Sequence, residues 1–163
     1  MAVLEAIKNR RAVREYSKKP VSDTVIEEVI KAAQFAPTGR DNKAVQFVVV
    51  REKATKEKLF LLLDQEYVRD APALIVAVTP ESGLAIQDLS IASQTIFLQA
   101  ASLGLGTVWK NVNPQKAPEA KAILGIPANF VLVNLIPIGY PNSAPAPHSD
   151  SDFDGKKIHL EKW

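Results

Sequence analysis

A cluster of basic side chains near the N-terminus is the first feature of the sequence with the chemistry of a binding site. Its members are Lys8, Arg10, Arg11, Arg14, Lys18 and Lys19. Residues 2–9 have one apolar face, which predicts a short helix. If that helix continues, Arg10 and Arg14, four residues apart, project from the same face. Two guanidinium groups placed in this way could bind a phosphate and one neighbouring group.

Two other interpretations of the basic cluster stand beside the anion site. A run of charges is commonly a solvated face without a partner. Binding to nucleic acid would require stacking aromatic side chains or a recognisable module, and Tyr16 is the one aromatic residue close by. The formal net charge of +2 is too small to imply such a partner by itself. We therefore expect no nucleic-acid partner.

A polar loop is the second candidate for a binding site. Residues 37–43 read PTGRDNK, a composition typical of turns. The Thr, Asp and Asn side chains could bind a ligand or the loop's own backbone. A helix is expected before this loop, ending near Ala36. Ser22, Asp23 and Thr24 are its candidate caps, and Thr24 and Glu27 fit a capping box. A buried strand is expected after it, over residues 45–50.

The composition excludes several classes of chemistry. The chain has no cysteine, so it has no disulfide, no thiolate nucleophile and no cysteine-ligated metal. His148 and His159 are its two histidines, too few for a multi-histidine site, and we predict no metal. No Ser-His-Asp set, GxGxxG fingerprint or P-loop stands out. The first residues do not follow a signal-peptide pattern, so the expected compartment is the cytoplasm.

The stretch between Asp88 and Lys110 contains no charged residue. Its apolar residues do not keep to one stripe, which predicts a buried helix over residues 84–103, either in a domain core or at a subunit interface. The Ser, Thr and Gln side chains in this helix would each need a partner in lipid, so we do not interpret it as a membrane span. Gly104 is the expected left-handed residue that ends the helix.

The remaining patterns predict the fold class. Helices are expected over residues 54–66 and from Asn113-Pro114 to Leu124, the second ended by Gly125. A short strand is expected at residues 107–109 and a strand buried on both faces at residues 130–138. Strands that alternate with helices predict an α+β sandwich, with helices covering a mixed sheet, in a single domain over residues 1–163. The tail after Pro141 should be irregular until residues 157–160.

Two stretches resemble the opening of the nitroreductase family of flavin mononucleotide (FMN) enzymes. They are RRAVREY at residues 10–16 and AAQFAPTGRDNKAVQFVVV at residues 32–50. Later landmarks of that family follow in order: a strand at residues 71–76, the uncharged helix with its GLG turn, a last strand unit at residues 124–141, and a tail at residues 153–163. The resemblance therefore covers essentially the whole chain.

The resemblance implies a homodimer that binds FMN at the subunit interface. It places Arg10 at the FMN phosphate and Arg14 at the N1/O2 edge of the ring, where a fixed positive charge stabilises the reduced flavin. Arg11 and Ala12 would lie beside the ribityl chain and phosphate. The backbone near the flavin N5 and O4 would come from Val108, Trp109, Lys110 and Asn111. A position in the core is the alternative for the Trp109 side chain.

The resemblance also implies that the polar loop contacts the flavin bound mainly to the other subunit. The residues concerned are Pro37, Thr38, Asp41 and Asn42. Many members of the family have Asn at the position of Asp41, so Asp41 and Asn42 remain alternative ligands. The family often has Ser in place of Ala12. His148 stands where relatives often place an Arg or Lys that closes over the phosphate.

The activity implied by the resemblance is electron transfer from NAD(P)H through FMN to nitroaromatic or quinone acceptors, in a ping-pong cycle. The cofactor carries this chemistry, so no catalytic side chain is expected. A flavin reductase or flavin carrier of the same fold is the alternative. The sequence has no long insert on either side of the central helix. We therefore expect an open flavin face that discriminates poorly among planar acceptors.

Overall fold

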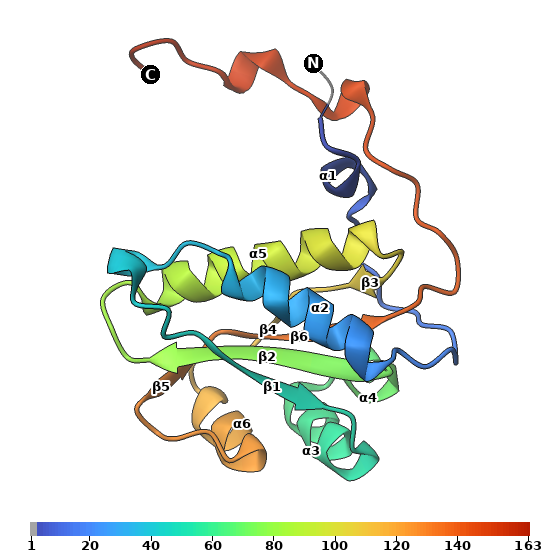
Figure 1. Cartoon of the computed structure of the whole chain (residues 1–163), viewed down its shortest axis with the longest axis vertical. Helices are drawn as coiled ribbons and strands as arrows, with labels where there is room; N and C mark the ends of the chain where they lie inside the picture. The colour runs from blue at the N-terminus through green and yellow to red at the C-terminus, as the bar shows by residue number, and fades with distance from the viewer. Residues whose placement is uncertain (1–2) are drawn as a thin grey trace.

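The computed structural model describes residues 3–163, and a six-stranded sheet forms its centre (Figure 1). The strands on the main path lie in the order β1 (Gln46–Val50), β2 (Ala73–Pro80), β6 (Asn134–Gly139) and β3 (Gly106–Thr107). Off this path, β4 (Lys110–Asn111) pairs with β6, and β5 (Phe130–Leu132) pairs with β2. These ladders are antiparallel, and a parallel bridge between Ala12 and Thr107 gives the sheet its mixed character.

Helices cover both faces of the sheet, which confirms the predicted α+β sandwich. One face is covered by α2 (Asp23–Gln34) and α5 (Ala85–Ser102), and the other by α3 (Lys53–Leu63), α4 (Glu66–Asp70) and α6 (Ala117–Leu124) (Figure 1). Seven of the eight residues of β2 and all six of β6 are buried. A strand packed on both faces needs apolar residues at nearly every position, which these continuous apolar runs supply.

The helix α5 begins and ends close to where the sequence predicted. Gly104 follows it with φ +71°, the left-handed conformation that favours glycine at a helix end. One side of the helix is buried in the core, through residues such as Leu89, Ile96 and Ala100. The opposite side is not covered within this chain, because Ile86 and Ile91 are 61% and 40% exposed. Of the two predicted locations, α5 thus has one face in the core and the other open.

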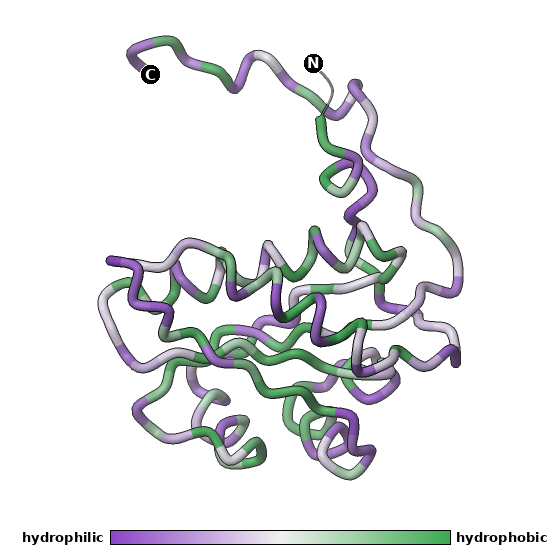
Figure 2. Tube along the Cα trace, viewed as in Figure 1, coloured by the Kyte–Doolittle hydropathy of each residue, from purple (hydrophilic) through white to green (hydrophobic). Residues whose placement is uncertain are grey.

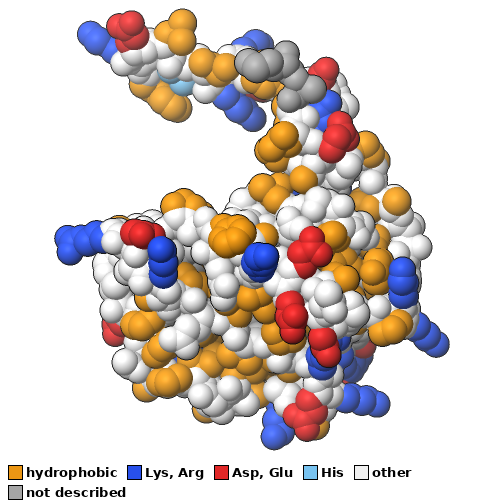
Figure 3. Space-filling model, in the orientation of Figure 1, with side chains coloured by type: hydrophobic (Ala, Val, Ile, Leu, Met, Phe, Trp, Pro, Cys, Tyr) orange, Lys and Arg blue, Asp and Glu red, His pale blue; other side chains and the backbone are white. Residues whose placement is uncertain are grey.

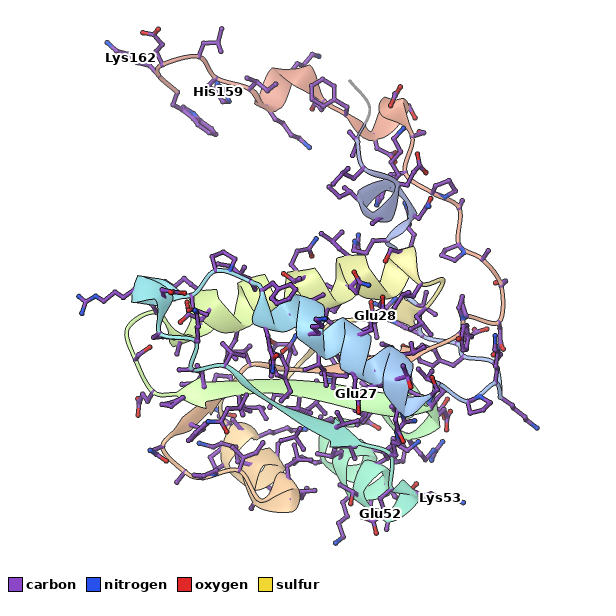
Figure 4. All side chains as sticks on the ribbon, viewed as in Figure 1. Glu27, Glu28, Glu52, Lys53, His159 and Lys162 are labelled. Atoms are coloured by element: carbon purple, nitrogen blue, oxygen red, sulfur yellow. The ribbon has the colours of Figure 1, made fainter. Side chains whose placement is uncertain are left out.

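The helix α1 (Glu5–Asn9) and the C-terminal tail extend away from this sandwich (Figure 1). All of residues 149–163 are exposed, and the tail has two single turns, η2 (Asp150–Asp152) and η3 (Gly155–Lys157). Its exposed apolar side chains are Phe153, Ile158, Leu160 and Trp163. Figures 2 and 3 show these apolar positions along the tail, separated from the body of the domain. Figure 4 places His159, whose ring stacks on Trp163, on the same outstretched segment.

Several element ends differ from the sequence prediction. Of the three candidate caps of α2, the structure uses Ser22, whose Oγ accepts a hydrogen bond from the Val25 N–H at 3.3 Å, and the capping box at Thr24 does not form. The helix predicted over residues 54–66 ends at Leu63, because Asp64 adopts a left-handed φ of 53° and α4 begins separately. The first helix begins at Glu5, and residue 2 lies outside the described residues.

Two predicted strands are each divided in the structure. The strand expected at residues 107–109 becomes β3 and β4, which pair with different parts of β6. The strand expected at residues 130–138 is interrupted at Val133. Its two parts, β5 and β6, both pair with β2. The helix α6 begins at Ala117 and ends at Gly125, which has φ +67° as expected. Residues 158–160 form no regular element.

Candidate functional site

The basic cluster lies on an extended arm, residues 10–16, that runs beside β3. The helix α1 ends at Asn9, and Arg10 already has extended dihedral angles. The Val13 N–H donates to the Thr107 carbonyl at 2.9 Å, next to the parallel bridge between Ala12 and Thr107. The first helix therefore ends at Asn9, as predicted, and does not continue through Arg14. Arg10 and Arg14 still share a side, because alternate residues of an extended chain project in the same direction.

A glycine in β3 allows the arm to approach so closely. A Cβ added to Gly106 would lie 2.6 Å from the Val13 Cβ, closer than the two atoms can come without displacement. Val13 itself is buried. At the end of the arm, the Tyr16 hydroxyl donates to the carbonyls of Val13 at 2.8 Å and Pro137 at 3.2 Å. Burial raises the pKa of Tyr16, so this hydroxyl keeps its proton and the arm its attachment.

Arg10, Ala12 and Arg14 line one cavity together with Val108 and Trp109. Its volume is about 170 Å³. A second cavity of about 230 Å³ shares Arg10 with the first and adds Arg11. Each is smaller than the roughly 300 Å³ at which typical small-molecule pockets begin. One chain thus brings five of the sequence-predicted residues to one cavity, and a sixth to its neighbour.

The arginines of the arm carry positive charge without an acidic partner. None of Arg10, Arg11 and Arg14 forms an ion pair with a carboxylate anywhere in residues 3–163. The Arg14 guanidinium lies over the Tyr67 ring, 5.9 Å from its centroid. Guanidinium groups that converge on a cavity without compensating charge favour an anionic ligand, and phosphate matches their hydrogen-bond geometry. These residues fit the phosphate and the electron-rich ring edge of FMN.

His148 is attached to this arm through Arg11. The backbone N–H of His148 donates to the Lys8 carbonyl at 2.8 Å, which brings the tail beside the arm. The His148 Nδ1 lies 3.0 Å from Asp152 Oδ2 and 3.1 Å from Arg11 Nη1. A carboxylate can only accept, so Nδ1 carries the hydrogen and donates to Asp152. The Nε2 atom, 3.4 Å from Arg11 Nη1, is then the acceptor for the guanidinium.

Sequence reasoning did not identify Asp152 as part of this arrangement. Its carboxylate accepts from the Ser149 N–H at 3.1 Å and from His148, and these bonds hold the pKa of Asp152 below its ordinary value. The spacing of His148 and Asp152, four residues apart in an irregular tail, gave no signal that they would meet. The arrangement holds Arg11 through a histidine that is itself held by a carboxylate.

Trp109 lies between the two interpretations considered for it. Its ring packs edge-on against Phe97, with centroids 6.3 Å apart, while the residue remains 37% exposed. An aromatic ring that is partly exposed and lines a cavity can stack on a planar ligand. Val108 is buried beside it.

Lys110 and Asn111 belong to β4 and line neither cavity of the arm. They pair with Leu135 and Asn134 of β6. Burial, and then the nearby charge of Lys116, lower the pKa of Lys110.

The polar loop forms a separate part of the candidate site. It contains a single turn, η1 (Gly39–Asp41), and its residues Arg40, Asp41 and Lys43 have φ of 56°, 52° and 50°. A left-handed conformation costs a residue with a side chain roughly 1–2 kcal/mol, so three in four positions are a concentration of strain. Strain of this kind persists where surrounding contacts enforce it, and it gathers at functional sites.

The two alternative ligands in the loop, Asp41 and Asn42, differ in their local contacts. The Asp41 carboxylate lies 3.4 Å from the Lys43 ammonium, and both are exposed. The Asn42 Oδ1 accepts from the Ala44 N–H at 2.9 Å, whereas its Nδ2 has no hydrogen-bond acceptor among residues 3–163. Asn42 therefore offers an uncommitted donor. Pro37, Thr38 and Asp41 line a cavity at the C-terminal end of α2. In the sequence, Asn42 lies next to Asp41.

The arm and the polar loop lie at opposite ends of α5 (Figure 1). The loop is anchored at Asp88, near the start of this helix, by a hydrogen bond from the Gly39 N–H. The cavities of the arm include Phe97 and Ala101, near its end. Nine residues separate Asp88 from Phe97, which is about 14 Å along a helix. Within one chain the two parts do not form a single pocket.

Comparison with known proteins agrees with this geometry. Residues 2–156 match a family model described as "Putative TM nitroreductase". The chain belongs to the nitroreductase family. A nitroreductase-family protein of Methanothermobacter thermautotrophicus, named "Putative NADH dehydrogenase/NAD(P)H nitroreductase", is 39% identical over an alignment that covers 100% of this chain and 88% of that protein.

Two solved structures of the nitroreductase family are similar over nearly the whole chain. An FMN-dependent nitroreductase from Clostridium difficile has 28% identity and a TM-score of 0.91, over 97% of this chain and 98% of that one. A nitroreductase from Desulfovibrio desulfuricans, solved in complex with FMN, has 26% identity and a TM-score of 0.84, over 97% and 95%.

Two further properties concern the described residues alone. No helix within residues 3–163 is both long and apolar enough to cross a membrane. The same residues contain no group of three or more His, Asp and Glu side chains placed to hold a metal ion.

Proposed function

We propose that this protein is an FMN-dependent oxidoreductase that uses NAD(P)H to reduce planar acceptors such as quinones and nitroaromatics. The observation that carries the proposal is the cavity that Arg10 and Arg14, without acidic partners, line together with the partly exposed Trp109. It has the charge for a phosphate and the flat surface for a ring. When bound, FMN would supply the redox chemistry that carries electrons from NAD(P)H to the acceptor in a ping-pong cycle.

The residues of the arm divide the work of binding between them. Arg10, shared by both cavities, binds the FMN phosphate. Arg14 lies at the N1/O2 edge, where its fixed charge favours the anionic reduced ring. Arg11, which is bonded to His148, adds a further positive charge to the phosphate site. Ala12 and the backbone of Val108 and Trp109 provide the close approach to the ring.

A homodimer completes this site. The exposed side of α5 is uncharged and carries Ile86, Gln87, Ser90 and Ile91, a surface that suits close packing against a second copy. A two-fold axis across α5 would place the start of one helix beside the end of the other, because the two copies then run in opposite directions. The polar loop of one chain would thereby reach the arm of its partner. Asn42 would then donate its free amide hydrogen to the flavin.

The apolar tail supports the same assembly. Phe153, Ile158, Leu160 and Trp163 are exposed, as are all of residues 149–163. Four large apolar side chains in solvent on an extended segment are unfavourable for an isolated molecule. In a dimer they would cover the surface of the partner.

Anaerobic stopped-flow spectroscopy tests the proposed activity. The purified protein is expected to show a flavin absorption band, to be bleached by NADH or NADPH, and to recover its colour with a quinone or a nitroaromatic. In steady-state assays that vary the concentrations of donor and acceptor, parallel lines in the double-reciprocal plot of the initial rate would indicate the ping-pong order. Flavin that binds without being bleached by either nicotinamide would indicate a carrier. Reoxidation by free FMN alone would indicate a flavin reductase.

A further inference from the structure

A buried carboxylate outside the cavities of the arm has no role in the function proposed so far. Asp88, in the first turn of α5, is 3% exposed. Its Oδ1 accepts a hydrogen bond from the Gly39 N–H at 2.8 Å. Its Oδ2 is buried and has no hydrogen-bond partner in residues 3–163. Burying a carboxylate with one oxygen unsatisfied is unfavourable. A neutral side chain would serve packing better, so the acid calls for another explanation.

The bond from Gly39 to Asp88 is the main attachment of the polar loop. The other hydrogen bonds of residues 38–43 are local, such as those from the Asp41 N–H to the Thr38 carbonyl and from the Lys43 N–H to Thr38 Oγ1. Among the described residues, Gly39 to Asp88 is the one hydrogen bond from this segment to a different element. Leu84, one turn before Asp88, packs against Gly39, where an added Cβ would meet its Cδ1 at 2.5 Å. Leu84 and Asp88 thus anchor the loop to α5.

Leu84 and Asp88 hold the loop in a conformation that it would not keep alone. Arg40, Asp41 and Lys43 are all left-handed, and an unanchored chain would relax from these angles. The same conformation directs Asn42, because its Oδ1 is bonded to the Ala44 N–H and its Nδ2 is left to point outward. The direction of that amide therefore depends on the anchor at Asp88.

We propose that Asp88 is a positioning residue of the FMN site, which fixes the polar loop so that the Asn42 amide is presented to the flavin. This inference rests on the proposed function, in which Asn42 binds FMN held mainly by a second chain. Asp88 does not touch the flavin. It acts through Gly39 and Asn42, by preventing the strained loop from relaxing.

Substitutions at Asp88 separate positioning from charge and from packing. Asp88→Asn keeps an acceptor oxygen for Gly39 and removes the charge, whereas Asp88→Leu and Asp88→Ala remove the acceptor. We expect the Kd for FMN, from quenching of flavin fluorescence by apoprotein, to rise about tenfold in the Leu and Ala variants and to stay within about threefold in Asp88→Asn. Glu81→Leu, an exposed acid just before the same helix, is the matched control and should leave the Kd unchanged.

A double-mutant cycle tests whether Asp88 acts through Asn42. Asn42→Ala removes the amide that the loop presents, so Asp88→Ala should weaken FMN binding no further in that background. Two effects that add fully would overturn the proposal, because Asp88 would then act by another route. A Kd for FMN within twofold of wild type in both Asp88→Leu and Asp88→Ala would also overturn it.

Hydrogen exchange of the apoprotein gives a reading that does not depend on FMN. The Gly39 amide and the neighbouring loop amides should exchange faster in Asp88→Ala and at the wild-type rate in Asp88→Asn. If exchange in the loop is unchanged in Asp88→Ala, the anchor is not Asp88 and the inference fails. If exchange responds as expected but wild-type protein binds no FMN, it is the proposed function that fails. Measuring exchange in the α5 core of each variant distinguishes a local loosening from loss of the fold.

Discussion

The Val13 N–H donates to the Thr107 carbonyl at 2.9 Å, and this bond attaches the arginine-bearing arm to the edge of the sheet. It determines which residues face the cavity. With Val13 directed into the core, its neighbours at even positions, Arg10, Ala12 and Arg14, face the other way. The spacing that presents two guanidinium groups together therefore comes from an extended chain held against β3.

Gly106→Ala should weaken both the fold and the cofactor site. The added methyl group would meet the Val13 side chain, which is branched at Cβ and cannot turn away easily, so the arm must shift. We expect a loss of about 1–3 kcal/mol in the free energy of unfolding, as for other overpacked cores, measured by urea denaturation. Gly83→Ala is the control, because an added Cβ there meets nothing within 4 Å. Equal stability of the two variants would contradict the close-approach argument.

Arg10→Ala should leave the protein folded but largely colourless. The guanidinium has no carboxylate partner to be stranded by its removal, so stability should change little. Losing a charge-assisted bond to phosphate is worth about 1.5–3 kcal/mol, or roughly a 10- to 100-fold higher Kd for FMN. Arg10→Lys should recover part of this, since lysine retains the charge but not the paired donors. Stoichiometric FMN in dialysed Arg10→Ala would show that the phosphate lies elsewhere.

Ile91→Glu should dissociate the dimer. This side chain is 40% exposed on the uncharged side of α5, and a carboxylate buried there against a second copy would be unpaired. Analytical ultracentrifugation is expected to show monomers that bind FMN weakly. Leu61→Glu is the matched control, because Leu61 is 73% exposed on α3, across the sheet from α5. The proposed interface would be refuted by dimers of Ile91→Glu that are as stable as those of Leu61→Glu.

The acceptor range should be broad. The chain passes from Pro80 at the end of β2 to Ala85 at the start of α5, and from Asn111 to Ala117, without a segment long enough to roof the flavin. A site with few converging polar groups discriminates poorly by shape. For acceptors of matched potential and different size, we expect kcat/KM to vary by less than about a thousandfold, or roughly 4 kcal/mol. A larger variation would mean that a shaped pocket selects among them.

The elements governed by local rules could be predicted from the sequence. The strands β2 and β6 are continuous apolar runs, and Gly104 and Gly125 end their helices in the expected left-handed conformation. The resemblance to the nitroreductase family was also correct, because it depended on several motifs in order along the whole chain. The local contacts of Asp41 and Asn42 needed coordinates, which place the Asp41 carboxylate near Lys43 and bond the Asn42 Oδ1 to the Ala44 N–H.

Contacts between distant parts of the chain could not be predicted in the same way. The sequence left open whether the first helix continues into the basic arm, and the pairing of Ala12 with Thr107, which makes the arm extended, has no signal in the sequence. The link from His148 to both Arg11 and Asp152 depends on the path of an irregular tail. The contacts of the polar loop with Leu84 and Asp88 join residues more than 40 positions apart in the sequence. No periodicity or composition signals such a contact.

A mixed-dimer experiment tests the central claim that each FMN site combines the arm of one chain with the polar loop of the other. Arg10→Ala and Asn42→Glu chains, carrying different tags, would be purified separately and then allowed to exchange. With random exchange of a two-fold dimer, half of the dimers are mixed and each has one intact site, so about a quarter of all sites should recover tight FMN binding. That FMN should be bleached anaerobically by NAD(P)H. If the mixture binds no more FMN than the two parents alone, although mixed dimers have formed, the site lies within one chain and the account is wrong.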